Sequence, residues 1–111
     1  MKKMQYIYET VNFLNQLYKL DSVILFGSKA RGDFDEYSDL DLLTITFKKL
    51  NNMEENLVTE GLYDIGMKHN VIFSPLNIAS KDWRGGIFTE FLIYNEILKD
   101  GVVCYESAIN N

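Results

Sequence analysis

The chain has 111 residues, which is long enough for one hydrophobic core but not two, so we expect a single domain spanning residues 1–111. Apolar residues make up 47% of the sequence and charged residues 24%, a balance that argues against disordered and collagen-like proteins. Sixteen acidic and eleven basic residues give a net charge of −5 without a basic cluster, so nucleic acid is not expected as the main partner.

The first half of the chain predicts one helix followed by two strands. Apolar residues recur at steps of three and four between residues 4 and 20, which is the repeat of an amphipathic helix. Residues 22–26 (SVILF) are a short apolar run ended by Gly27, which is typical of a buried strand. Polar sequence continues to Ser38, and residues 39–47 (DLDLLTITF) predict a second strand with aspartates at its entry.

The next segment predicts a helix and a strand. Residues 51–69 return to helical spacing, with Asn51 or Asn52 available as the N-cap. Residues 70–79 (NVIFSPLNIA) have the composition of a strand. Because Pro75 cannot donate to a ladder, this strand is expected at the edge of the sheet or with a bulge.

The C-terminal part predicts a last helix between Ser80 and Gly101 and a short strand over residues 102–106 (VVCYE). Gly85 and Gly86 lie inside the helical pattern, so we expect the helix to start late or to break there. The predicted order is helix, strand, strand, helix, strand, helix, strand. This order indicates an α+β fold, with an α/β-like small mixed β-sheet flanked by helices.

Two further features bear on the compartment. No segment approaches the ~20 consecutive apolar residues of a membrane span, so no membrane association is expected. Cys104 is the only cysteine, which excludes an internal disulfide and fits a reducing interior. We therefore expect a cytoplasmic protein.

The paired aspartates are the first candidate site. Side chains alternate along a strand, so Asp39 and Asp41 point to one face about 7 Å apart, while Leu40 and Leu42 point to the other. The two carboxylates repel each other, and Mg²⁺ bound by them together with substrate phosphates would offset that repulsion. For this tripeptide alone, the alternative of two solvated acids at a strand edge stays open.

The glycines before the aspartates are the second candidate site. The stretch GSKARG has the glycine spacing of a P-loop, but it continues with Asp-Phe where a P-loop requires Lys followed by Ser or Thr. At the end of a buried strand, the backbone at Gly27 and the hydroxyl of Ser28 can hold phosphate oxygens, with Lys29 and Arg31 as phosphate partners. Taken alone, each residue also fits a solvated turn between two strands.

Taken together, these features resemble the signature of the DNA polymerase β nucleotidyltransferase superfamily. The residues that carry the resemblance are Gly27, Ser28, Ala30, Arg31, Gly32, Ser38, Asp39 and Asp41. The resemblance is strongest to the minimal, single-domain nucleotidyltransferases that accompany HEPN-type toxins, and it extends over most of the chain. It implies a mixed, polymerase β palm-like sheet flanked by helices.

The resemblance also implies an activity and its site. The protein would transfer a nucleoside monophosphate, namely AMP from ATP, to an acceptor hydroxyl, which in this branch is a tyrosine of a cognate toxin. Asp39 and Asp41 would ligate Mg²⁺, with two ions possible, and Gly27 and Ser28 would grip the phosphates. Ser38 would orient an aspartate. The implied partners are ATP and the toxin, in a homo- or hetero-oligomer.

The chain departs from the family pattern at one point. The pattern includes a third carboxylate on the following strand, but no Asp or Glu occurs between residues 70 and 80, and Ile72 stands where the acid is expected. Asp64 or Asp82 can substitute only if the fold brings it within ligand distance. A second function therefore stays open, namely a catalytically degenerate nucleotide-binding module that neutralises a toxin by direct binding. A small-molecule transferase is disfavoured because the chain is too short for an acceptor-binding domain of its own.

Overall fold

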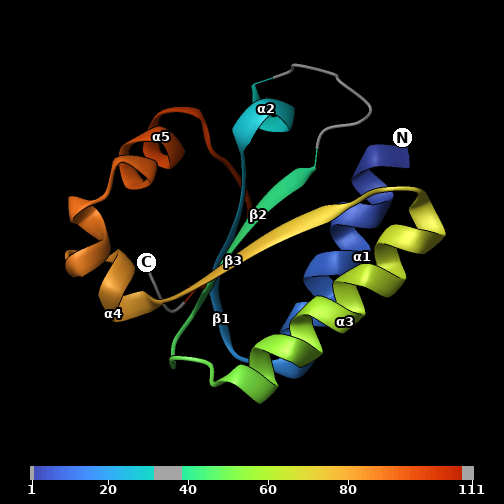
Figure 1. Cartoon of the computed structure of the whole chain (residues 1–111), viewed down its shortest axis with the longest axis horizontal. Coiled ribbons are helices and arrows are strands. Elements are labelled where there is room, and N and C mark those ends of the chain that lie inside the picture. The colour runs from blue at the N-terminus through green and yellow to red at the C-terminus, as the bar shows by residue number, and fades with distance from the viewer. Residues whose placement is uncertain (1, 32–38, 109–111) are drawn as a thin grey trace.

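The computed structural model of the protein describes residues 2–31 and 39–108 (Figure 1). Its elements are α1 (Lys2–Leu17), β1 (Leu20–Phe26), α2 (Gly27–Ala30), β2 (Leu40–Thr46), α3 (Asn52–His69), β3 (Phe73–Ala79), α4 (Ser80–Trp83), η1 (Ile87–Glu90), α5 (Leu92–Asp100) and β4 (Val102–Glu106). The strands form a sheet in the order β3-β2-β1-β4, with β2 and β3 parallel and the other two pairs antiparallel. The predicted mixed sheet is confirmed. Among these described helices, none combines the length and the apolar character needed to cross a bilayer.

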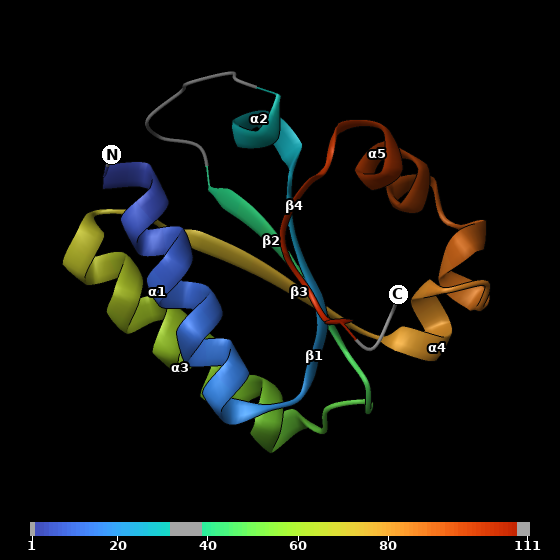
Figure 2. The same ribbon diagram turned by 180° about the vertical axis from the view of Figure 1, so that it is seen from behind.

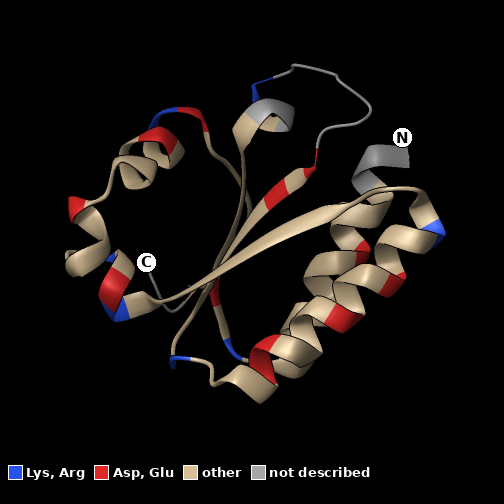
Figure 3. Cartoon of the chain, viewed as in Figure 1, with Lys and Arg blue, Asp and Glu red and all other residues tan. Residues whose placement is uncertain are grey.

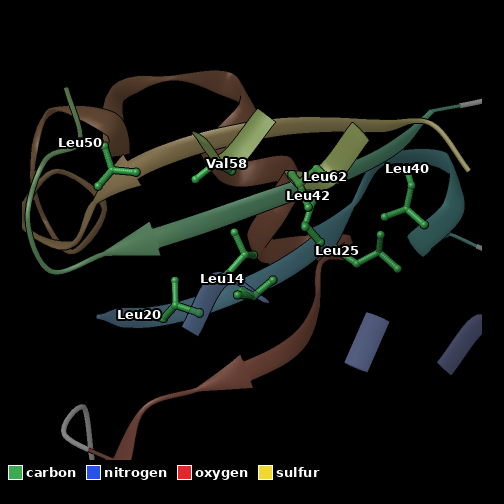
Figure 4. Packing of buried hydrophobic residues seen from close by; sticks show 9 residues of the cluster. Leu14, Leu20, Leu25, Leu40, Leu42, Leu50, Val58 and Leu62 are labelled. Carbon is green, nitrogen blue, oxygen red and sulfur yellow. The ribbon is translucent and has the colours of Figure 1, made fainter. Parts of the chain in front are cut away.

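Helices cover both faces of the sheet (Figures 1 and 2). On the first, which we call the α1–α3 face, α1 and α3 pack against β1 and β2 (Figure 4). Its buried residues are Leu14, Leu20, Val23, Leu25, Leu40, Leu42, Leu50, Val58 and Leu62. On the second, the α4–α5 face, the buried residues are Ile24, Leu43, Ile45, Ile78, Trp83 and Ile97. Because Asp41 shares its strand parity with Leu43 and Ile45, it belongs to the α4–α5 face.

Helix α3 begins at a capping box. The side chain of Asn51 accepts a hydrogen bond from the Glu54 N–H at 2.8 Å, and the Asn51 N–H donates to the Glu54 carboxylate at 3.0 Å. The helix ends at Asn70, which adopts a left-handed conformation with φ of 59°. Of the two N-cap candidates, the structure therefore selects Asn51.

Strand β3 lies at one edge of the sheet, as Pro75 predicted. The Leu40 N–H donates to the Ile72 carbonyl at 2.8 Å, so the backbone groups of Ile72 and of alternate residues after it face β2. Pro75 falls on the opposite parity, and its missing N–H faces away from the sheet. The strand keeps its ladder to β2 through the proline. It begins at Phe73, three residues later than the expected start.

The expected C-terminal helix is divided into α4, η1 and α5. The break falls at the paired glycines, as predicted. Gly85 has φ of +84°, which side chains disfavour, and a β-carbon on Gly86 would lie 2.3 Å from the Lys81 carbonyl oxygen. A single helix through this segment is therefore excluded.

Strand β1 starts at Leu20, two residues before the expected position, and it includes the fully buried Asp21. The Asp21 carboxylate accepts hydrogen bonds from the Ser22 hydroxyl at 2.6 Å, from the Ser80 hydroxyl at 2.5 Å and from Arg84 Nε at 2.9 Å. Arg84 Nη2 also donates to it. These contacts tie α4 to the first residues of β1, at the end of the strand away from Gly27.

Candidate functional site

The paired aspartates lie at the start of β2, beside the end of β1. Asp39 directly precedes β2 and is exposed, and Asp41 is the second residue of the strand, paired with Phe26. Figure 3 shows this acidic end of β2 next to α2. As predicted from the strand repeat, Leu40 and Leu42 point into the α1–α3 face, opposite to Asp41.

The end of β1 meets Asp41 directly. Gly27 has φ of +76°, and a β-carbon built on it would lie 2.1 Å from Asp41 Oδ2. From Gly27 the chain turns into α2, where the Arg31 N–H donates to the Gly27 carbonyl at 3.2 Å. Only glycine combines this backbone conformation with such a close approach to a carboxylate.

The electrostatics of Asp41 reflect this crowding. Burial raises the pKa of the Asp41 carboxyl above its ordinary value, and the charge of Asp39 raises it further. A hydrogen bond from the Ser74 hydroxyl and the positive charge of Arg31 act in the opposite direction but do not cancel the rise in pKa. Among the described side chains, Arg31 and Ser74 offset the two neighbouring carboxylates only in part, an arrangement that a divalent cation would relieve.

The neighbouring strand places Ser74 beside Asp41. In the parallel register of β2 and β3, Asp41 pairs with Ser74, so the two side chains share the α4–α5 face. Continuing this register by two residues back from Asp41 and Ser74 puts Ile72, which is 68% exposed, next to Asp39. No acidic colour appears on β3 in Figure 3. Sequence reasoning missed Ser74, although the two-residue strand repeat from Ile72 leads to it.

Neither acidic substitute lies near Asp41. Asp64 is exposed on α3, which packs on the opposite face of the sheet. Asp82 lies in α4, beyond the far end of β3, separated from Ser74 by about 16 Å of strand. Over residues 2–31 and 39–108, no group of three or more His, Cys, Asp and Glu side chains is placed to hold a metal ion.

The side chains of three predicted site residues lie outside the part of the chain that the structure describes. The backbone of Ser28 and Lys29 lies in α2, but their side chains are outside what the structure describes, as is Ser38 altogether. Arg31 is exposed and close enough for its charge to lower the pKa of Asp41. The described residues that the fold brings together are Gly27, Arg31, Asp39, Asp41 and Ser74.

Comparison with known families decides the class of this site. Residues 7–102 match the model of the nucleotidyltransferase domain family. The chain belongs to this family. The close approach of Gly27 to Asp41 therefore lies in a nucleotidyltransferase domain, within a family of nucleotidyl-transferring enzymes.

Two relatives of this nucleotidyltransferase domain come from Methanocaldococcus jannaschii. Both are predicted protein adenylyltransferases. The first is 40% identical over 58 residues, which cover 52% of this chain and 59% of the relative. The second is 28% identical over 107 residues, which cover 95% of this chain and 100% of the relative.

Solved structures share the fold of this nucleotidyltransferase domain. A toxin-antitoxin crystal structure with AMP-PNP superposes with a TM-score of 0.65 at 14% identity, covering 96% of this chain and 76% of the other. A tri-AMPylated HEPN toxin of Shewanella oneidensis in complex with MNT antitoxin gives a TM-score of 0.62 at 14% identity, covering 99% and 76%. At these identities, the likeness establishes the mixed sheet with flanking helices.

Proposed function

We propose that the protein transfers AMP from ATP to a hydroxyl group, and that the acceptor is a tyrosine of a HEPN-type toxin. The observation that carries this proposal is the contact of the Gly27 backbone with the Asp41 carboxylate, with Asp39 alongside. The similarity to two predicted protein adenylyltransferases supports the transfer of AMP to a protein. The toxin-antitoxin structures, one with AMP-PNP and one with an AMPylated toxin, support the choice of partner.

The acidic pair suits the cation that accompanies a triphosphate. Two carboxylates lie at one end of β2, where burial and the charge of Asp39 raise the pKa of Asp41. Asp39 and Asp41 would hold Mg²⁺, which prefers one or two carboxylates together with substrate phosphates. When bound, Mg²⁺ would neutralise charge on the leaving pyrophosphate.

The remaining residues would bind and orient the nucleotide. The absence of a side chain at Gly27 leaves its backbone accessible at the carboxylate, and Gly27 and Ser28 would hold phosphate oxygens. Lys29 and Arg31 would add positive charge along the triphosphate, and Ser38 would orient an aspartate. The acceptor oxygen then forms a bond to the α-phosphorus, and the bond from that phosphorus to the oxygen bridging to the β-phosphate breaks. Pyrophosphate leaves, and the acceptor proton passes to solvent.

A second function is favoured by one observation, the absence of an acid on β3. In this alternative the protein binds nucleotide but neutralises the toxin by occluding it. The two functions share the same partner and the same complex, a hetero-oligomer with the toxin. Both are proposed for the cytoplasm, where ATP and Mg²⁺ are available.

Incubation with α-³²P-labelled ATP, Mg²⁺ and purified toxin separates the two. Transfer predicts label on the toxin with the wild-type protein, none with Asp41→Asn, and wild-type labelling with Asp64→Asn, an exposed carboxylate on the other face. Equal labelling by Asp41→Asn, or none by the wild type, would end the transferase proposal. If Asp39→Asn and Asp41→Asn still neutralise the toxin, the occluding module is the better description.

A further inference from the structure

Ser74 occupies a defined place in the site. It is the direct partner of Asp41 in the parallel register of β2 and β3, on the same face of the sheet. Its hydroxyl lies close enough to the Asp41 carboxylate to lower the pKa of that carboxyl. On the β1 side, Gly27 lies so close to that carboxylate that a β-carbon would collide with it. Asp41 is therefore held between a glycine on one neighbouring strand and a hydroxyl on the other.

A hydroxyl in this place has a different electrostatic consequence from a carboxylate. Two divalent cations about 4 Å apart repel each other strongly and are held together by bridging anionic ligands. The described site offers two carboxylates, and Ser74 adds no charge. Ile72, which directly precedes β3 and has the same parity as Ser74, is apolar, while Asp64 and Asp82 lie on the opposite face and beyond the far end of β3.

Resting on the proposed function, we propose that Ser74 is a positioning residue for Asp41 and that the site binds one divalent cation with the nucleotide instead of two. The bound cation accompanies the triphosphate, and no second ion lowers the pKa of the acceptor hydroxyl. A phenol, with a pKa near 10, needs less activation than an aliphatic hydroxyl, so a one-ion site favours tyrosine over serine or threonine as acceptor. The uncharged Ser74 on β3 would thus favour a tyrosine acceptor.

The number of bound ions tests this inference. The purified protein is dialysed to equilibrium against Mn²⁺ and α,β-methylene-ATP, which cannot be cleaved at the α-phosphate, and the ions and nucleotides retained per chain are counted. The wild type is expected to retain one Mn²⁺ per nucleotide. Ser74→Asp is expected to retain two, because it supplies the missing anion. Asn56→Asp adds the same charge on an exposed position of α3 and is expected to retain one.

A second pair of variants tests whether the Ser74 hydroxyl positions Asp41. Ser74→Thr keeps the hydroxyl and is expected to bind Mn²⁺ with the wild-type affinity. Ser74→Ala removes it and is expected to bind one Mn²⁺ several-fold more weakly. Equal affinity of Ser74→Ala and the wild type would overturn the positioning role.

Two outcomes would overturn the one-ion site, and another would overturn the role of Ser74 in it. Two ions in the wild type would do so while leaving the proposed function intact, and this count is decisive even if Ser74→Asp fails to fold. A second ion in Ile72→Asp but not in folded Ser74→Asp would move the third position from Ser74 to Ile72. Failure of the wild type to retain nucleotide and Mn²⁺ would overturn the proposed function as well.

Discussion

Gly27 approaches Asp41 so closely that a β-carbon on the glycine would lie 2.1 Å from the carboxylate oxygen Oδ2. The same glycine has φ of +76°, a conformation that side chains disfavour. The end of β1 and the start of β2 are therefore fixed relative to each other by a contact that leaves no space for a side chain. Any substitution at Gly27 must move the backbone, the carboxylate or both.

Gly27→Ala is expected to reduce transfer by about 100-fold, because displacing a reacting group or its ligand by about 1 Å costs that much. It is also expected to lower the free energy of unfolding by about 1 to 2 kcal/mol through its left-handed backbone. Denaturant titration and the labelled-ATP assay measure the two effects separately.

Gly85→Ala is the matched control. Gly85 has φ of +84°, but a β-carbon there would meet no atom within 4 Å. It is expected to lose a similar free energy of unfolding and to keep its transfer activity. If Gly85→Ala lost transfer to the same extent, the effect at Gly27 would reflect stability and not the contact with Asp41.

Asp21 makes the stability of the fold depend on pH. Burial alone would raise the pKa of this carboxyl, but the hydrogen bonds from Arg84, Ser22 and Ser80 and the charge of Arg84 outweigh it, so its pKa lies well below the usual range. The unfolded chain, with an Asp pKa near 3.9, therefore takes up a proton first as the pH falls. The stabilisation is complete above about pH 5 and is lost progressively in acid.

Asp21→Asn is expected to lower the free energy of unfolding by about 3 kcal/mol at neutral pH, because it leaves the Arg84 guanidinium without its buried partner. The difference from the wild type should narrow as the pH falls below about 4. Asp64→Asn, which changes an exposed carboxylate, is expected to have little effect. A difference between Asp21→Asn and the wild type that stays constant down to acidic pH would contradict this account.

Gly61 sets the distance between α1 and α3. A β-carbon there would lie 1.8 Å from Cζ of the Phe13 ring, so Gly61→Ala must displace that ring. Overpacking costs about 1 to 3 kcal/mol, whereas alanine gains about 1 kcal/mol of helix propensity, and we expect a net loss of about 1 kcal/mol. In a Phe13→Leu background the same substitution is expected to stabilise the protein. A double-mutant cycle with denaturant unfolding measures this coupling, and its absence would show that the ring moves freely.

Asn51 and Asn52 allow a direct test of the capping box. Asn51→Ala removes the side-chain acceptor for the Glu54 N–H and is expected to lower the free energy of unfolding by about 1 kcal/mol. Asn52→Ala lies at the first helical residue, without a capping bond, and is expected to be neutral or slightly stabilising. Thermal unfolding of the two variants, which carry the same change one residue apart, shows whether Asn51 or Asn52 caps α3.

The elements with a clear repeat could be predicted from the sequence, whereas those that depend on distant partners could not. The helix from residue 51 and the break at Gly85 follow from local chemistry, namely a cap and a glycine pair. The start of β1 could not be predicted from the sequence. The charged Asp21 can lie in a buried strand only because Arg84, some sixty residues later, neutralises it. Helix α2 is too short for a periodic pattern to indicate it.

The candidate site shows the same division. Asp39 and Asp41 could be placed at the strand entry because side chains alternate along a strand, and the motif tied them to Gly27. The pairing of Asp41 with Ser74 could not be predicted, because the register between two parallel strands depends on how the connecting helix packs. Ile72 and Ser74 have the same parity, and only the register shows which one is the direct neighbour of Asp41.

The orientation of Pro75 restricts how other molecules can associate with this protein. A strand joins a sheet by hydrogen bonding to a row of free N–H and C=O groups, and the proline removes a donor from that row on the outer side of β3. If a second copy or an extended peptide added a strand along this side, its backbone ladder would therefore be interrupted at Pro75. A molecule that binds along the outer side of β3 therefore depends more on contacts with side chains than on a continuous backbone ladder.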